Sequence, residues 1–376
     1  MAVGLLFLIL AIPADPAEEP GSTPWPFAPA DRAHRVSNLY HEPLRLESAR
    51  GYLHGGIDIR VPARTPVLSV ARGTVWIYRE AGYDNLVLTE ANGDSWEYRH
   101  LAADFVPAAI RTAMEEGTPI EAGVPIGEVG PWGLGYTHLH FNRRRANGTI
   151  VDPLAELLPL ADSHAPEVRS IDLVPAGGLT PWPAEASGDA DPSDDGGDGV
   201  VTVAGAVDIV SDIVDRTDLE DTFLHPPHRA RVLLESEGEA EQREIARWNP
   251  FDDALPDVSG HPVPRYPRGP GLQAYQRFGP LALRNPIPRP LPQRLSICLT
   301  RGDPERPGVP RPWDTRTVPD GLYTLRVIAT DRRGNEGTGT RRIRIANETP
   351  PAPPEDSTPD PLIRTLSTHA LSLIHI

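Results

Sequence analysis

The stretch YTHLHF (Tyr136–Phe141) decides the fold of the sequence around it. Residues two apart on a β-strand share one face of a sheet, so His138 and His140 point to the same side while Leu139 points to the other. The earlier stretch WEYRHL (Trp96–Leu101) alternates in the same way. Both stretches therefore predict strands that carry polar side chains toward one face.

A third stretch, HGGID (His54–Asp58), places a histidine and a carboxylate close together in the sequence. Gly55 and Gly56 disfavour a helix between them, because glycine is a poor helix former. The pattern therefore differs from the helical zinc motif, in which two histidines lie one turn apart. We expect a site built on strands and on their edges.

Together the three stretches offer five candidate side chains, His54, Asp58, His100, His138 and His140. Imidazole and carboxylate groups are ligands that zinc accepts, and a catalytic zinc keeps three protein ligands and one open position. Five candidates for three places leave two histidines to act on a substrate. This ratio favours a catalytic metal site over a structural one.

The order of these motifs resembles that of a known family. The stretch from about Ser37 to Leu158 resembles the LytM/lysostaphin-type zinc endopeptidases of bacterial cell walls, which read H-x-x-x-D, then Y-x-H-L, then H-L-H-F. Four shorter matches support the resemblance, namely Thr65–Val67, Gly73–Val75, Pro125–Gly127 and Val151–Pro153. It implies an all-β fold, the β-barrel-like catalytic domain called the duplicated hybrid motif.

The resemblance also implies roles for the five side chains. His54, Asp58 and His140 would hold one zinc ion (Zn²⁺) per chain, and His100 and His138 would lie on the substrate side. A zinc ion lowers the pKa of bound water and polarises a peptide carbonyl. The two remaining histidines would take up the water proton and stabilise the oxyanion. Which histidine does which stays open.

The chain departs from the family pattern at four places. Arg64 stands where a glycine is usual, Arg99 replaces a small residue and by alternation faces away from His100, and Asn142 stands where an acidic residue is frequent. An insert, Ala102–Gly117, contains a run that predicts a short helix capped by Gly117. None of these changes a candidate ligand, so we expect them to affect the groove and its specificity.

Other histidines are expected to be ordinary surface residues, namely His34, His164, His225, His228 and His261. His41 precedes the first candidate ligand and is a candidate for the border of the groove.

Composition bounds the architecture and the partners. The chain has 376 residues, which predicts two domains. All 36 basic residues are arginines, and the net charge of −16 argues against binding nucleic acid or docking on anionic polymers. The single cysteine, Cys298, is expected in the core of a strand.

The two ends of the chain carry separate expectations. Residues 1–20 contain the apolar run Val3–Ile12, which predicts a signal peptide and export and is too short for a stable membrane span. No cysteine follows this run, which argues against a lipoprotein anchor. The proline-rich tail, 349–376, is expected to be disordered. Its last six residues, Leu371–Ile376, match a translated sequencing adapter and are interpreted as an artefact.

Between these ends we expect a peptidase domain over 26–160 and a β-sandwich over 165–348. Strands are predicted at Val168–Leu173, Gly199–Val210, Ala230–Glu235, Leu295–Thr300, Gly321–Asp331 and Thr340–Ala346. The sequence of the last hairpin resembles the closing hairpin of bacterial immunoglobulin-like sandwiches. Ser187–Gly199 is expected to be a solvated acidic loop rather than a calcium site, and Trp248–Leu291 a long surface excursion.

The sequence therefore predicts an exported zinc endopeptidase that acts on peptidoglycan peptides, in the periplasm, the cell envelope or outside the cell. One alternative is a regulator that binds the cell wall without cutting it or that activates a separate amidase. Another is a peptidase whose substrate is a secreted protein or a bacteriocin-like peptide.

Overall fold

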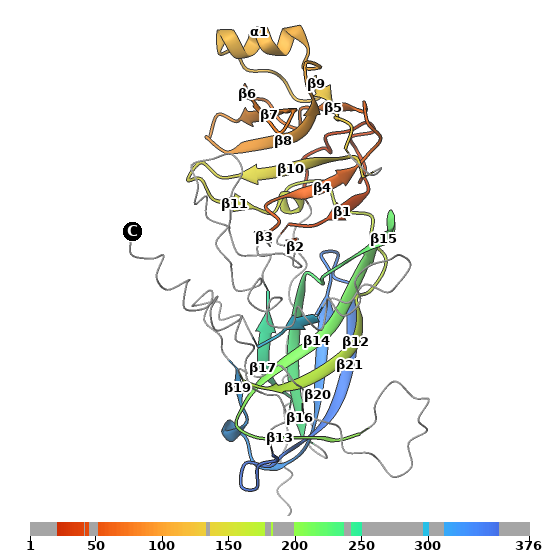
Figure 1. Cartoon of the computed structure of the whole chain (residues 1–376), viewed down its shortest axis with the longest axis vertical. Coiled ribbons are helices and arrows are strands. Elements are labelled where there is room, and N and C mark those ends of the chain that lie inside the picture. Colours follow the sequence, from red (N-terminus) through yellow and green to blue (C-terminus); the bar gives the residue numbers. More distant parts are fainter. Residues whose placement is uncertain are drawn as a thin grey trace, which may run out of the picture.

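The chain forms two β-rich regions that lie one above the other in Figure 1. The computed structural model describes residues 21–40, 42–44, 52–132, 136–176, 182, 199–236, 242–249, 296–300 and 312–352. Strands dominate these residues, and α1 is the one α-helix among them. The all-β class predicted from the sequence is confirmed.

The N-terminal region, residues 21–160, is organised around a 7-stranded sheet of order β1-β4-β10-β8-β7-β6, with β11 paired to β10. Its strands are β1 (Val36–Asn38), β4 (Ile57–Arg60), β6 (Thr74–Glu80), β7 (Tyr83–Thr89), β8 (Ser95–Ala102), β10 (His138–Arg144) and β11 (Ile150–Val151). Neighbouring strands are antiparallel. Among the described residues β1 and β6 are edges, so the sheet is open and shows no closure into a barrel.

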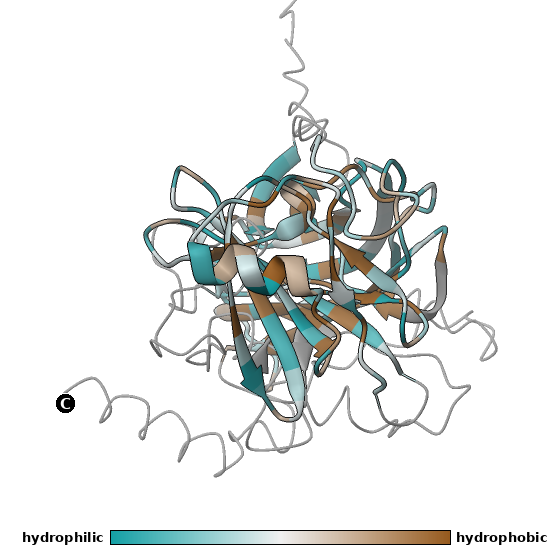
Figure 2. Ribbon diagram, turned by 90° about the horizontal axis from the view of Figure 1, so that it is seen from above, coloured by the Kyte–Doolittle hydropathy of each residue, from teal (hydrophilic) through white to brown (hydrophobic). Residues whose placement is uncertain are grey.

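Smaller elements complete this region. They are the two-stranded sheets β2 (Pro43–Leu44) with β3 (Tyr52–Leu53) and β5 (Pro66–Leu68) with β9 (Pro125–Glu128), the helix α1 (Ala108–Glu116), and a 3₁₀ turn at Pro153–Ala155. The predicted helix is confirmed. Gly117 ends it in the left-handed conformation at φ 65°, which glycine adopts without steric cost. Hydrophilic and hydrophobic residues mix along α1 (Figure 2), which buries Ile110.

The period of two along β10 separates the core from the polar site. Leu139 and Phe141 are fully buried in the hydrophobic core, and the ring of Phe141 stacks on Trp96 of β8 at 5.1 Å between centroids. His138 and His140 project from the opposite face. Burial of the apolar face thereby fixes the register, since a slip by one residue would place the histidines in the hydrophobic core instead.

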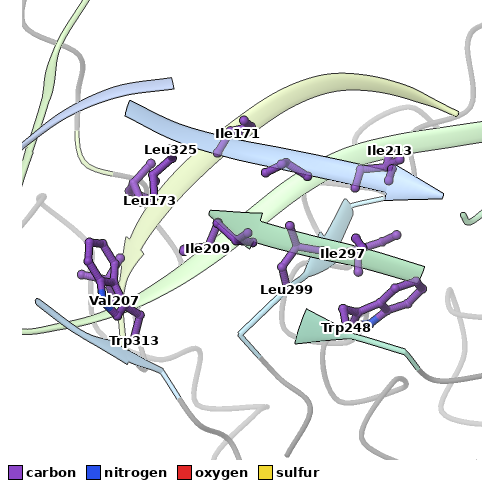
Figure 3. Close-up of a cluster of buried hydrophobic side chains, with 14 of the residues drawn as sticks. Ile171, Leu173, Val207, Ile209, Ile213, Trp248, Ile297, Leu299, Trp313 and Leu325 are labelled. Carbon is purple, nitrogen blue, oxygen red and sulfur yellow. The ribbon is translucent and has the colours of Figure 1, made fainter. Parts of the chain in front are cut away.

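The C-terminal region consists of two sheets that share one hydrophobic core (Figure 3). One sheet has the order β12-β14-β15, with β18 and β19 also paired to β14, and the other has the order β13-β21-β20-β16-β17. The strands are β12 (Glu167–Pro175), β13 (Val201–Val203), β14 (Ala206–Thr217), β15 (Glu220–His225), β16 (Arg229–Ser236), β17 (Gln242–Trp248), β18 (Ser296–Cys298), β19 (Trp313–Asp314), β20 (Gly321–Thr330) and β21 (Glu336–Ile345), with a 3₁₀ turn at Thr315–Thr317. Apolar side chains from both sheets meet between them, as a sandwich requires.

Most predicted strands of this region are confirmed within a few residues. The prediction of one strand over Gly199–Val210 is wrong: Gly205, at φ 73°, separates β13 from β14, and β14 continues to Thr217. Three strands were missed, namely β15, β17 and the two-residue β19. β15 borders a turn rich in acidic residues. β17 reads QREIARW, in which polar residues obscure the alternation of apolar and polar side chains. Cys298 is fully buried in β18, as predicted.

The two regions contact each other through apolar and polar groups. Tyr40 and Ile150 of the N-terminal region belong to the hydrophobic cluster of the C-terminal region. Arg332 forms an ion pair with Asp152, and Asn335 donates a hydrogen bond at 3.3 Å to the carbonyl of Asp162, in the segment that joins the two regions. The regions therefore meet through a specific interface.

Several predictions lie outside the described residues. These are the signal peptide, His41, most of the acidic stretch Ser187–Gly199, nearly all of Trp248–Leu291 and the tail from residue 353 onward. Within the described part of the chain, no helix is long and apolar enough to cross a membrane.

Candidate metal centre

The pairing of β4 with β10 brings the first two candidate ligands together. Asp58 lies directly opposite His140 in this antiparallel pair, and the His140 Nδ1 to Asp58 Oδ1 distance is 2.9 Å. His54 precedes β4, and its Nε2 atom lies 2.8 Å from His140 Nδ1 and 3.2 Å from Asp58 Oδ1. Three donor atoms from two separate stretches of sequence thus converge on one point.

These three residues form a group that can hold a metal ion. Donor atoms around a tetrahedral zinc ion, each about 2.0–2.2 Å from the metal, lie roughly 3.3–3.5 Å apart. The observed separations of 2.8, 2.9 and 3.2 Å are slightly shorter, so a small outward shift of the side chains makes room for an ion. Two imidazoles and one carboxylate are also a donor set that zinc accepts.

Backbone carbonyls orient two of the histidines. His54 Nδ1 lies 2.9 Å from the carbonyl oxygen of Leu39, and His138 Nδ1 lies 3.1 Å from that of Tyr136. In each case a proton on Nδ1 completes the hydrogen bond and leaves the Nε2 lone pair facing the centre. His138 Nε2 lies 3.7 Å from Asp58 Oδ1, just beyond the three converging atoms.

A polar network that the sequence analysis missed fixes Asp58. Asn38, its partner across β1 and β4, donates a hydrogen bond from Nδ2 to Asp58 Oδ2 at 2.7 Å, which leaves Oδ1 for the centre. Asn38 also donates to the hydroxyl of Tyr136 at 2.7 Å, and Ser37 shares a 2.7 Å hydrogen bond with the same hydroxyl. The only sequence signal was the position of Ser37 and Asn38 ahead of the first ligand and of Tyr136 beside the HLH triplet.

His100 occupies the end of β8 in an unusual backbone conformation. Its φ of 65° is left-handed, which costs a residue other than glycine on the order of 1 kcal/mol or more. The Asn85 side chain accepts a hydrogen bond from the His100 amide at 3.0 Å, and the Gly130 amide donates to its carbonyl at 2.8 Å. These bonds hold the ring toward His138, 5.0 Å away between centroids.

Two aromatic rings border His100. Trp132 lies 4.5 Å from the His100 ring and stacks on Tyr83 at 5.4 Å between centroids. Tyr83 also lies 5.3 Å from His100, with the rings nearly perpendicular. The rings of His100, His138 and Trp132 therefore form one mutually contacting cluster, in which Trp132 also lies 5.1 Å from His138.

Burial and neighbouring charge set the pKa values at the centre. Burial lowers the pKa of His100 to about 2, with His140 and His138 adding to the effect, and burial lowers that of His140 to about 4. Burial also opposes charge on His54, but the Asp58 carboxylate outweighs it and raises the His54 pKa. Despite its own burial, Asp58 has a pKa held well below the usual value by the histidines. The result is an ionised carboxylate beside neutral His100 and His140.

The departures from the family pattern leave the centre intact. Arg64 adopts φ 69°, a left-handed conformation that explains why a glycine is usual there, and its guanidinium lies over the Phe105 ring at 3.4 Å. Arg99 pairs with Glu80, and Asn142 donates a hydrogen bond to Glu97 at 2.9 Å. The left-handed conformation of Arg64 is therefore energetically unfavourable, and its contact with Phe105 partly offsets this cost.

Comparison with known proteins agrees with the β-rich fold. Residues 52–153 match Peptidase family M23. This M23 segment contains His54, Asp58, His100, His138 and His140. This segment is therefore similar to a peptidoglycan-related family of zinc metallopeptidases.

Solved structures similar to the chain overlap about a third of it. They include a zinc-containing peptidase from Vibrio cholerae (24% identity, 37% of this chain, 40% of that chain, TM-score 0.28). Others are the catalytic domain of a prophage-encoded M23 protein from Enterococcus faecalis (22% identity, 33% and 95%, TM-score 0.25) and the SpoIIQ–SpoIIIAH pore-forming complex (19% identity, 37% and 93%, TM-score 0.30). No curated protein matches the chain. The chain spans less than half the length of the Vibrio cholerae protein.

Proposed function

We propose that this chain is an exported zinc endopeptidase that hydrolyses peptide bonds in peptidoglycan stems or cross-links. The observation that carries the proposal is the convergence of three donor atoms, from His54, Asp58 and His140, beside two further histidines in the M23 segment. A binding protein has no need for the two additional histidines. Their presence favours an enzyme over the wall-binding or amidase-activating alternative.

The five side chains divide into two groups in this proposal. His54, Asp58 and His140 hold the zinc ion, and Asn38 keeps Asp58 in place. Zinc bound there polarises the scissile carbonyl and lowers the pKa of water toward neutrality. His100 and His138 take up the proton of the attacking water, donate a hydrogen bond to the oxyanion and return the proton to the leaving amine. The low pKa of His100 keeps it neutral before the reaction.

The remaining parts of the proposal concern the rest of the chain. We assign the peptidase domain to residues 26–160 and an immunoglobulin-like sandwich to residues 165–348, and export to a signal peptide in residues 1–20. The two facing sheets of the C-terminal region support the sandwich. With a net charge of −16, binding to an anionic wall has to rest on the groove rather than on overall charge.

The test compares the wild type with His138→Ala, which leaves the three proposed ligands intact. Both proteins are loaded with zinc and incubated with purified sacculi, and the released fragments are analysed by mass spectrometry for new amine termini. Fragments from the wild type alone support the proposal and name the bond, since loss of a general acid–base group costs about 10²–10⁴-fold in rate.

Two other outcomes contradict the proposal. No fragments from a wild type that binds zinc would favour the regulator. Cleavage of soluble glycine-rich peptides without cleavage of sacculi would place the substrate outside the wall.

A further inference from the structure

A short turn of the N-terminal region holds His54 by two hydrogen bonds. The His54 amide donates to the carbonyl of Glu42 at 2.8 Å, and its Nδ1 atom bonds to the carbonyl of Leu39 at 2.9 Å. The turn is closed by the Glu42 amide, which donates to Leu39 at 3.3 Å, and by the Leu39 amide, which donates to Glu42 Oε2 at 2.7 Å. The orientation of His54 therefore depends on the Leu39–Glu42 turn.

The C-terminal region holds this turn in place. Tyr40 is fully buried in the hydrophobic cluster of the C-terminal region and donates its hydroxyl hydrogen bond to Ile150 at 2.9 Å. Strand β15 reaches up to β1 at the junction of the two regions (Figure 1). At the end of β15, His225 Nδ1 lies 3.6 Å from Glu42 Oε2. One side chain of the C-terminal region thus contacts the carboxylate that closes the turn.

The contact between His225 and Glu42 is unusual because His225 is buried without a hydrogen bond from the described residues. The residue is 1% exposed, and neither ring nitrogen has a hydrogen-bond partner among the described residues. A buried polar group without a hydrogen bond costs on the order of 1–3 kcal/mol. The Glu42 side chain is itself 7% exposed, so the two groups face each other in a site largely shielded from water.

We propose that His225 is a positioning residue of the metal centre, which acts through Glu42 and the Leu39–Glu42 turn on His54. The C-terminal region is then part of the centre, because it completes the support of one ligand. Groups that orient a metal ligand typically contribute 10–100-fold to metal affinity. The inference rests on the proposed binding of zinc by His54, Asp58 and His140.

The test measures zinc affinity of the full chain by competition with a chromophoric chelator. His225→Leu removes the ring nitrogens at similar volume, whereas His225→Asn keeps an N–H group near the Nδ1 position. We expect His225→Leu to weaken zinc binding about tenfold or more and His225→Asn to restore most of the loss. Arg332→Ala, which breaks a separate ion pair between the regions, is expected to leave the affinity within about twofold of the wild type.

A double-mutant cycle separates positioning from a general loss of structure. Glu42→Gln is expected to weaken zinc binding as His225→Leu does, and the double variant is expected to show no further loss, because both changes break one contact. Additive losses, an unchanged affinity in His225→Leu, or an equal loss in Arg332→Ala would overturn the inference. If His225→Leu fails to fold, Glu42→Gln with His225→Asn gives the same test. A wild type that binds no zinc would instead overturn the proposed function.

Discussion

Among the described residues, two largely buried clusters each bring three possible metal ligands together, and they do so in opposite ways. In the cluster of His54, Asp58 and His140, two imidazoles flank one carboxylate beside the paired strands β4 and β10. Asp162, Asp215 and Asp331 gather three carboxylates at the junction of the two regions. The first cluster keeps its carboxylate ionised, whereas the second makes ionisation costly.

The pKa values show this contrast directly. The histidines hold the pKa of Asp58 well below its usual value against the effect of burial. Burial, together with the charges of Asp162 and Asp331, raises the pKa of Asp215 to about 8. Proximity of ligand atoms alone therefore does not make a metal centre. The donor set and its supporting hydrogen bonds distinguish the two clusters.

The largest loss of zinc affinity is expected from removing the hydrogen bond that holds the Asp58 carboxylate. Asn38→Ala takes away the hydrogen bond that fixes Oδ2, so the carboxylate gains freedom to rotate away from the centre. We expect zinc affinity to fall about 10–100-fold, as for other groups that orient metal ligands. A chelator competition titration measures it.

Ser37→Ala is the matched control, because Ser37 bonds to the Tyr136 hydroxyl at 2.7 Å and to the backbone carbonyl of Asp58 at 3.3 Å but not to the Asp58 carboxylate. Equal losses in the two variants would mean that the network, and not the orientation of the carboxylate, sustains the affinity.

A smaller effect, on the free energy of unfolding, is expected from a change in the cluster of Asp162, Asp215 and Asp331. The folded-state pKa of Asp215 is raised, so its stabilising contribution is present below the unfolded pKa of 3.8 and is lost as pH rises toward about 8. Asp215→Asn removes this titration. Relative to the wild type, the variant should gain more than about 1 kcal/mol of stability between pH 4 and pH 9. Urea unfolding at the two pH values measures the gain.

Asp218→Asn provides a control of opposite sign. Hydrogen bonds from Ser163 lower the pKa of Asp218, so this residue contributes stability that is present above its unfolded pKa and is lost as pH falls. The variant should therefore lose stability at pH 9 relative to the wild type. If Asp218→Asn gained as much stability as Asp215→Asn, the conclusion that burial raises the pKa of Asp215 would be contradicted.

The sequence predicted what depends on local periodicity. The alternation in YTHLHF predicted the strand β10 and the shared face of His138 and His140, and the insert after His100 contains the predicted helix α1. Spacing also singled out five side chains that the fold brings together. Such features are encoded within a few residues of one another.

What the sequence could not predict depends on contacts between distant segments. Asn38 reaches Asp58 only because β1 pairs with β4, and no periodic pattern marks it. His225, expected to be an ordinary surface residue, is buried against Glu42 from the other region of the chain. The left-handed conformation of His100 likewise depends on Asn85 and Gly130, which lie on other segments.

The central claim is that the cluster of His54, Asp58 and His140 holds zinc, and that the cluster of three aspartates does not. The most direct measurement is the zinc content of the wild type, Asp58→Ala and Asp215→Asn after loading with zinc and desalting. We predict one zinc ion per chain in the wild type and in Asp215→Asn, and none in Asp58→Ala. Retention of zinc by Asp58→Ala, or its loss from Asp215→Asn, would contradict the claim.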